Sequence, residues 1–325
     1  MDFAGDRISQ LPEPIKHHIM SFLPYRDELR TGILSKTWQN ARASYPILIF
    51  LESRFEGGDL TRPTKTTERK LRFMDMVENS ILKLYKRGMT LQRFVLQLVL
   101  PEHDDHNLGL RVDNWLELVS EAKVKELSLD FKSYYALNEM NNRYRPHCNL
   151  PQIIFGSKSL LTYLMLRNCT IEHLVFHAST RCDSLRELLL GKVNISDDIL
   201  QKILLCCSSS LIRLELWYCL GVKNLRLSGL NKLKKVTVVE SHHERLESIE
   251  IEAPSLCYFH CDVSSRRTRI SLVACANLEE LSIPNSFVWE QISEYVGSKF
   301  PLLKRLSIDD CSRLRRFEID FESSS

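Results

Sequence analysis

A short apolar motif recurs along most of the chain, and it constrains the fold more than any other feature of the sequence. The motif is an apolar residue, two others, an apolar residue, one other and a third apolar residue. It begins at Leu91, Val124, Leu161, Leu185, Leu211, Leu233, Leu256, Leu278 and Leu303. The last seven starts lie 22 to 26 residues apart. This regular spacing indicates a solenoid, in which each unit buries its apolar side chains against its neighbours.

An LxxLxL motif with a period of about 20–29 residues is the signature of leucine-rich repeats. We therefore expect an α/β fold, with parallel strands on the inner face of a solenoid and helices and short strands outside. Half-motifs at Val222, Leu246 and Leu314 predict second strands on the outer face. Outer helices are expected from Ser196 and over residues 288–296. The cysteines that follow three of the motifs, Cys169, Cys219 and Cys311, occupy the Asn/Cys position of the repeat.

The inner face of the solenoid is the expected binding surface. Side chains alternate along a strand, so the third, fifth and seventh residues of each motif point to this face. The residues predicted to bind a target there are Tyr163, Arg167, Arg213, Glu215, Trp217, Lys235, Tyr258, His260 and Arg305. Trp, Tyr and Arg contribute most of the binding energy at protein interfaces. We expect Trp217, Tyr258 and Arg213 to be the anchors, the alternative being that these are simply exposed strand positions.

The first forty-odd residues form a separate apolar segment. Ile15, Ile19, Phe22 and Leu23 follow at helical spacing after Pro14, and Ser35 can cap a later helix that carries Trp38. So short a segment cannot bury its own apolar surface, because domains below roughly 40 residues usually need staples or partners. It contains no cysteine. It must therefore pack against another protein or, alternatively, serve as a helical cap on the solenoid.

This segment resembles a plant-type F-box. The matching residues are Leu11-Pro12, Ile15, Ile19, Ser21-Phe22-Leu23-Pro24, Arg26-Asp27, Arg30-Thr31, Leu34-Ser35-Lys36 and Trp38. The resemblance implies three helices that dock onto a Skp-type adaptor, which in turn joins a cullin–RING ubiquitin ligase. It also implies that the adaptor-binding surface is formed or supported by Leu11, Pro12, Ile15, Ile19, Leu23, Leu34 and Trp38.

The resemblance to plant F-box/leucine-rich-repeat proteins covers nearly the whole chain. Residues 150–171 and 246–263 are similar to segments of the FBD-associated type, whose further C-terminal domain is expected to be absent here. The expected domains are an F-box over residues 1–50, a solenoid over 91–321 and a tail over 322–325. Residues 51–90 are predicted to be a linker and a bridging helix. Its apolar stripe comprises Leu71, Met74, Val77, Ile81, Leu84 and Tyr85, and Gly88 is expected to end it.

Composition excludes several other classes of function. Among 325 residues, 44 Lys and Arg against 41 Asp and Glu give a formal net charge of +3, which argues against a nucleic-acid-binding protein. No apolar run reaches the roughly 18 residues of a membrane span, and the N-terminus lacks a signal core. We therefore expect reduced cysteines and a location in the nucleus or the cytoplasm, without cofactor or metal. Residues 102–106 hold metal-binding side-chain types, but a solvated loop is the better interpretation.

The sequence thus predicts a non-catalytic adaptor subunit that recruits targets to an SCF-type ubiquitin ligase. Two alternatives from other classes stay open. One is a protein-interaction scaffold outside any ligase, or a small-molecule or hormone sensor built on the repeats. The other is an enzyme, such as a metal hydrolase at Glu102 to His106. The target protein itself is not named by any feature of the sequence.

Overall fold

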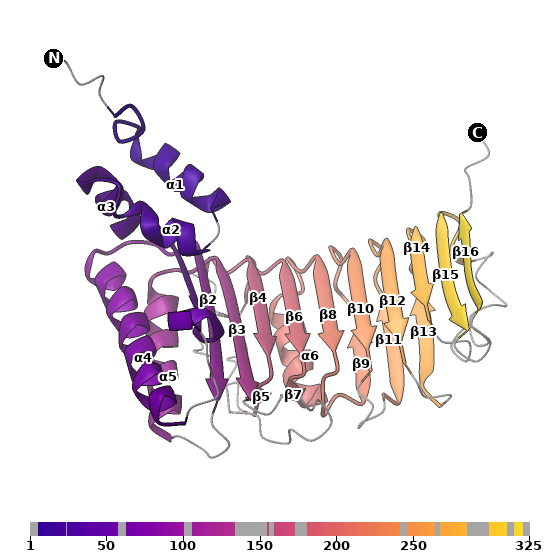
Figure 1. The fold of residues 1–325 in the computed structure, drawn as a ribbon. Coiled ribbons are helices and arrows are strands. Elements are labelled where there is room, and N and C mark those ends of the chain that lie inside the picture. Colours follow the sequence, from indigo (N-terminus) through magenta and orange to yellow (C-terminus); the bar gives the residue numbers. More distant parts are fainter. Residues whose placement is uncertain are drawn as a thin grey trace.

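The computed structural model describes residues 6–23, 25–57, 63–100, 106–133, 155, 159–172, 181–240, 246–263, 267–284, 299–310 and 315–320. Three short helices stand at the N-terminal end of a long row of strands, and longer helices flank the first strands (Figure 1). This arrangement agrees with the expected α/β fold of a small helical segment followed by a solenoid. Within the described residues, no helix is both long and apolar enough to cross a membrane.

The N-terminal helices are α1 (Glu13–Phe22), α2 (Tyr25–Thr31) and α3 (Lys36–Ala43). Pro12 precedes α1, and Ser35 caps α3 by accepting a hydrogen bond from the Trp38 backbone N–H at 3.4 Å. The segment has a small core of its own, comprising Met20, Trp38, Ala41 and Tyr45, against which Ile19 and Ile47 pack. It is too small to cover every apolar side chain of the three helices.

One 11-stranded sheet forms the inner face of the solenoid. In spatial order its strands are β1 (Ile47–Leu51), β2 (Arg93–Leu100), β3 (Glu126–Ser133), β4 (Tyr163–Arg167), β6 (Glu187–Gly191), β8 (Arg213–Trp217), β10 (Lys235–Val239), β12 (Tyr258–Asp262), β14 (Glu280–Ile283), β15 (Arg305–Asp310) and β16 (Arg315–Asp320). Each of the nine motifs supplies one strand, from β2 to β15. Neighbouring strands are parallel except for β15 and β16.

Both ends of this sheet differ from the sequence prediction. The solenoid was expected to begin at residue 91, but β1 already pairs in parallel with β2, in the register Ile47↔Arg93. The half-motif at Leu314 was expected to form an outer strand. Its strand β16 instead pairs antiparallel with β15 in the inner sheet, because the chain turns back directly after β15. Because the last strand is antiparallel, the sheet edge that it exposes differs from the edge that another parallel repeat would expose.

The outer face carries short strands and one described helix. The strands β9 (Asn224–Leu227), β11 (Ser248–Glu252) and β13 (Arg269–Val273) form a second parallel sheet, and β5 (Thr170–Ile171) pairs with β7 (Asn194–Ile195). The predicted helix after Ser196 is confirmed as α6 (Asp197–Cys206), whose Ile199 N–H donates to the Ser196 hydroxyl. The second strands predicted at Val222 and Leu246 are confirmed, whereas the helix expected over residues 288–296 lies outside the described residues.

Two long helices and a 3-10 turn (η1, Glu52–Gly57) complete the N-terminal part of the solenoid. The bridging helix predicted within residues 51–90 is α4 (Pro63–Lys86), and Gly88 follows it with a φ of 63°. Two predicted stripe residues, Leu71 and Tyr85, are exposed, while Phe73 is buried instead. The helix α5 (His106–Glu121) begins at the last residue of the segment 102–106 that was interpreted as a solvated loop.

Candidate functional site: two protein-binding surfaces

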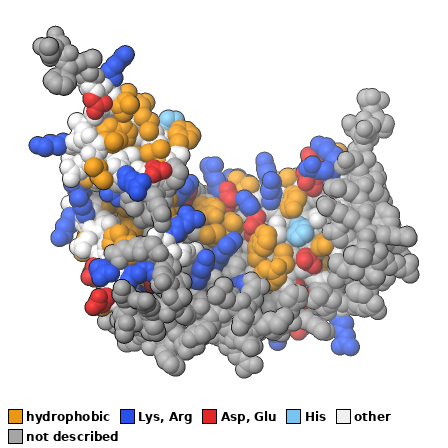
Figure 2. Space-filling view, in the orientation of Figure 1, with side chains coloured by type: hydrophobic (Ala, Val, Ile, Leu, Met, Phe, Trp, Pro, Cys, Tyr) orange, Lys and Arg blue, Asp and Glu red, His pale blue; other side chains and the backbone are white. Residues whose placement is uncertain are grey.

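The first surface lies on the three N-terminal helices. Phe22 and Ile33 are 75% and 85% exposed, and Ile8, Ile15 and Leu34 are also largely exposed. Figure 2 shows hydrophobic side chains gathered over these helices. Single exposed apolar residues are ordinary, but several on one small segment mark an interaction site. These side chains are left over after the small core around Trp38 is filled.

The segment before α1 is fixed by hydrogen bonds to α1 and α3. The ammonium of the buried Lys16 donates to the Ser9 carbonyl oxygen at 2.8 Å and lies 5.9 Å from the centre of the Trp38 ring. The Thr37 hydroxyl donates to the same carbonyl at 2.9 Å, and the Ser9 hydroxyl donates to that of Ser35 at 2.8 Å. These contacts hold the backbone at Leu11 in place beside the exposed helices.

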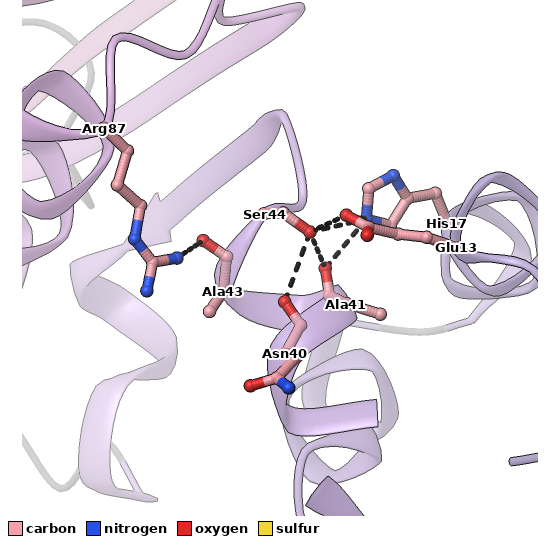
Figure 3. Close-up of polar contacts among 7 residues, drawn as sticks. All are labelled: Glu13, His17, Asn40, Ala41, Ala43, Ser44 and Arg87. Carbon is pink, nitrogen blue, oxygen red and sulfur yellow. Dashed lines mark hydrogen bonds and ion pairs between the residues drawn. The ribbon is translucent and has the colours of Figure 1, made fainter. Parts of the chain in front are cut away.

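A polar cluster joins α1 to the end of α3 and to the solenoid (Figure 3). His17 Nε2 lies 2.8 Å from the Ala41 carbonyl oxygen, and the Ser44 hydroxyl bonds the Glu13 carboxylate. From the other side, Arg87 after α4 donates to the Ala43 carbonyl oxygen at 2.7 Å. The three helices are therefore tied to the solenoid through the last residues of α3.

The second surface is the inner face of the solenoid. It is formed by the side chains of β2 to β15 that point away from the buried core. Its charged residues are mostly paired across neighbouring strands. Arg93 bonds Glu126 at 2.5 Å, and Arg213 contacts both Glu187 at 3.3 Å and Glu215 at 2.5 Å. These arginines are therefore already engaged by carboxylates of the protein itself.

Aromatic residues on this face are held by polar neighbours. The Trp217 Nε1–H donates to Glu215 at 3.0 Å, and the Lys235 ammonium lies 6.0 Å from the centre of the Tyr258 ring. Burial, followed by the nearby Glu187, raises the pKa of Tyr163, and burial with the nearby Glu280 does the same for Tyr258. Both phenols are therefore neutral at physiological pH and can donate a hydrogen bond.

An open cleft of about 490 Å³ lies at the N-terminal end of the inner face. Its walls include Arg93, Glu126, Tyr163 and Glu187, from β2, β3, β4 and β6. Its size falls within the range of small-ligand pockets. Its lining combines charged side chains, among them the Arg93–Glu126 ion pair, with the apolar Val95 and the ring of Tyr163.

Comparison with known families identifies both parts of the chain. The F-box domain model matches residues 8–41, and the model named "At1g61320/AtMIF1, LRR domain" matches residues 81–317, which is more than half of the chain. The chain belongs to the plant F-box/leucine-rich-repeat proteins. The three N-terminal helices are thus its F-box, and the row of strands is its repeat domain. No solved structure matches the chain.

Relatives from Arabidopsis thaliana share this organisation. F-box/LRR-repeat protein 25 is 28% identical over 258 residues, which are 78% of this chain and 85% of the relative. F-box protein At5g03100 is 26% identical over 278 residues, 86% of this chain and 76% of the relative. F-box/FBD/LRR-repeat protein At3g59240 is 31% identical over 260 residues, which are 78% of this chain but 46% of the relative. Some relatives are therefore about twice the length that this chain spans.

The residues predicted for adaptor binding lie in three environments on the F-box. Pro12, Ile15 and Leu34 are exposed; Leu11, Ile19 and Leu23 are half-buried; Trp38 is 2% exposed and supports the F-box core rather than the surface. Sequence reasoning left Phe22 and Ile33 out of the predicted surface. Phe22 had been placed in the packing stripe of α1, whereas the structure buries Met20 and Lys16 there.

The residues predicted for target binding all lie on the inner face, but they differ in availability. Tyr163, Arg213, Glu215, Tyr258 and His260 are half-buried, while Arg167, Trp217, Lys235 and Arg305 are exposed. His260 Nδ1 lies 2.9 Å from the Ser282 hydroxyl, and Arg305 bonds Glu280. Arg213 is held between two glutamates, so it is a weaker anchor than its residue type suggested.

The cysteines have packing roles. Cys169, Cys207 and Cys261 are fully buried, as expected for Cys261 from its position in the motif. Cys219 is half-buried, and Cys311 lies outside the described residues. No cluster of three His, Cys, Asp or Glu residues suited to a metal occurs among the residues that the structure describes. Residues 102–105, where an alternative metal site was considered, lie outside those residues.

Proposed function

We propose that this protein is the substrate-recognition subunit of an SCF-type cullin–RING ubiquitin ligase. The observation that carries the proposal is the exposure of Phe22, Ile33 and Leu34 on an F-box whose own core is already complete. Burying each such side chain is worth about 1.5–3 kcal/mol. A Skp-type adaptor that covers all three would gain most of the free energy needed for stable binding.

The repeats would hold the target protein on the inner face. Catalysis would reside in other subunits, and this chain would act by bringing the target close to the conjugating enzyme. The tie between Arg87 and Ala43 supports this division of labour, because it links the adaptor-binding part to the target-binding part. The proposal places the protein in the nucleus or the cytoplasm, without a cofactor.

The test is co-purification of the full chain with a Skp-type adaptor. We expect the wild-type protein to bind the adaptor, and the double substitution of Phe22→Ala with Ile33→Ala to abolish binding. The thermal unfolding of the double variant should match that of the wild type, because neither side chain is buried. Leu205→Ala, which removes a 59% exposed leucine from α6 on the solenoid, is the control and should bind normally.

A wild-type chain that binds no adaptor would overturn the ligase proposal and favour the alternative of a scaffold. Retention of the adaptor by the double variant would also contradict it, since the exposed patch would then have no role. A second experiment, proximity labelling with a chain that carries the double substitution, should trap target proteins without their destruction.

A further inference from the structure

Arg167 differs from the other described arginines that point to the inner face. Arg93, Arg213 and Arg305 each form an ion pair with a glutamate on a neighbouring strand or on their own. The exposed Arg167 forms no ion pair with any residue that the structure describes. A partner could therefore bind its guanidinium without breaking an ion pair to any of the described residues.

The neighbours of Arg167 explain why it is uncommitted. On β3, its register partner is Asp130, whose two oxygens accept hydrogen bonds from Asn168 at 2.8 Å and from Gln97 at 3.2 Å. On β6, its register partner is Gly191, which has no side chain. One neighbouring carboxylate is thus occupied, and the other neighbour offers nothing to bind.

The absence of a side chain at Gly191 also sets the direction of Arg167. A Cβ placed on Gly191 would lie 3.1 Å from Arg167 Cγ and 3.4 Å from its Nε, so the arginine lies across the glycine. This direction leads toward β8, where the residue at the same register level is Trp217. Trp217 is 41% exposed, and its indole is oriented by the hydrogen bond to Glu215.

The next residue, Tyr218, is exposed in a conformation that tyrosine rarely adopts. Its φ is 54°, close to the values of 57° at Asn168 and 52° at Lys192, which follow β4 and β6 in the same way. Asn and Gly suit this left-handed turn best, and a bulky residue there is strained. An aromatic residue that is held in a strained backbone conformation next to an exposed tryptophan is typical of a functional site.

We propose that Arg167, Gly191 and Trp217, with Tyr218 at the rim, form a subsite that accepts an anionic side chain of the target protein. An arginine fork bonds a carboxylate or a phosphate through two parallel N–H groups, and the two rings would pack against the flanking residues of the target segment. The inference rests on the proposed target-binding role of the inner face. The main anchor for the target is then Arg167, which forms no ion pair with the described residues, and not Arg213, which is paired with two glutamates.

The test uses immobilised nonapeptide libraries that are random except for a fixed central residue. That residue is glutamate, phosphoserine, serine or lysine, and the binding protein is the full chain prepared together with a Skp-type adaptor. We expect the glutamate or the phosphoserine library to retain about tenfold more protein than the serine library, the effect of one charge-assisted hydrogen-bond pair. Retention by one of the two alone would identify the anion as a carboxylate or as a phosphate.

Two substitutions probe the site directly. Arg167→Gln should remove the preference for the anionic libraries, and Gly191→Ala should reduce it several-fold, because the added Cβ displaces the arginine. The matched control is Arg226→Gln on the outer sheet, which removes the same charge from an exposed position and should leave the preference unchanged. Thermal unfolding of all three variants should match that of the wild type.

The inference is overturned if no anionic library exceeds the serine and lysine libraries, or if Arg167→Gln keeps the preference. The adaptor in the same preparations separates this failure from failure of the ligase proposal. A complex that forms normally but shows no anionic preference contradicts the subsite alone. A chain that selects anionic peptides but binds no adaptor supports the subsite and contradicts the ligase role.

Discussion

Arg87 Nη1 donates a hydrogen bond to the carbonyl oxygen of Ala43 at 2.7 Å, so the residue after α4 holds the last residue of α3 (Figure 3). This contact fixes the F-box relative to the repeats. We expect Arg87→Ala to destabilise this junction by about 0.5–1.5 kcal/mol, the net contribution of one hydrogen bond. Amide hydrogen exchange should become faster at the end of α3 and stay unchanged in the inner sheet.

The matched control for this prediction is Lys86→Ala, which removes an adjacent exposed cation from α4. Equal exchange at the end of α3 in the wild type and in Arg87→Ala would show that the junction is held by other contacts, such as the bond from the Gln92 N–H to the Pro46 carbonyl.

Lys16 supports the F-box from inside. Its aliphatic chain is buried, and its ammonium bonds the Ser9 carbonyl beside the Trp38 ring. We expect Lys16→Ala to lower the stability of the F-box by about 1–3 kcal/mol, through lost packing and a lost charge-assisted hydrogen bond. Hydrogen exchange in α1 and α3 measures the effect. The exposed Lys36, changed to Ala, should cause no comparable increase in exchange.

Much of this fold follows from the sequence, because the alternation of apolar residues sets which side of each strand is buried. Nine of the eleven strands of the inner sheet, β2 to β15 in spatial order, were predicted for this reason. The strand β1 was missed because Ile47 to Leu51 is a continuous apolar run without the motif. The availability of Arg167 and Arg213 could not be predicted either. Both arginines point to the inner face, Arg167 at the end of β4 and Arg213 at the start of β8, and their difference depends on their register partners on β6, Gly191 and Glu187.

Glu52 links pH to the stability of the N-terminal end of the solenoid. Burial raises the pKa of this carboxyl above its ordinary value of 4.5, although Lys70 and Arg69 act in the opposite direction. The folded protein then binds a proton more tightly than the unfolded chain does. The stability contribution of Glu52 is therefore greatest at low pH, and it is lost as the pH rises from 4.5 through the raised pKa.

We expect Glu52→Gln to flatten this part of the pH profile and to be at least as stable as the wild type at pH 7. In the wild type the Val99 N–H donates a hydrogen bond to the Glu52 carboxylate at 2.7 Å. The amide oxygen of the variant can still accept this bond, and no charge is then buried. Urea unfolding between pH 4.5 and pH 7.5 measures the effect. A variant less stable than the wild type at pH 7 would show that the ion interactions with Lys70 and Arg69 outweigh burial.

The buried cysteines should resist alkylation in the folded protein. Burial raises the pKa of Cys206 to about 11 and raises those of Cys207 and Cys261 as well. Since the thiolate is the reactive form, we expect iodoacetamide at pH 7.5 to modify the half-buried Cys219 and Cys257 before the other cysteines that the structure describes. Mass spectrometry of peptides measures the order in which the cysteines are labelled. Unfolding in urea should abolish the difference between them. Early modification of Cys261 would contradict its place in the core.

Tyr218 offers a direct measure of a trade between stability and binding. The turns after β4, β6 and β8 have a left-handed backbone at their first residue, and Asn168 shows that asparagine fits the equivalent position. We expect Tyr218→Asn to raise the free energy of unfolding by about 1 kcal/mol, because asparagine adopts this conformation with less strain. The same change should weaken binding to the target, since it removes an exposed ring beside Trp217. Asn168→Tyr, the reverse change after β4, should destabilise the fold by more than this amount, because it also removes the hydrogen bond from the Asn168 amide to Asp130. Urea unfolding of both variants measures the two changes in the free energy of unfolding. A Tyr218→Asn variant that is no more stable than the wild type would mean that the tyrosine ring itself stabilises the turn.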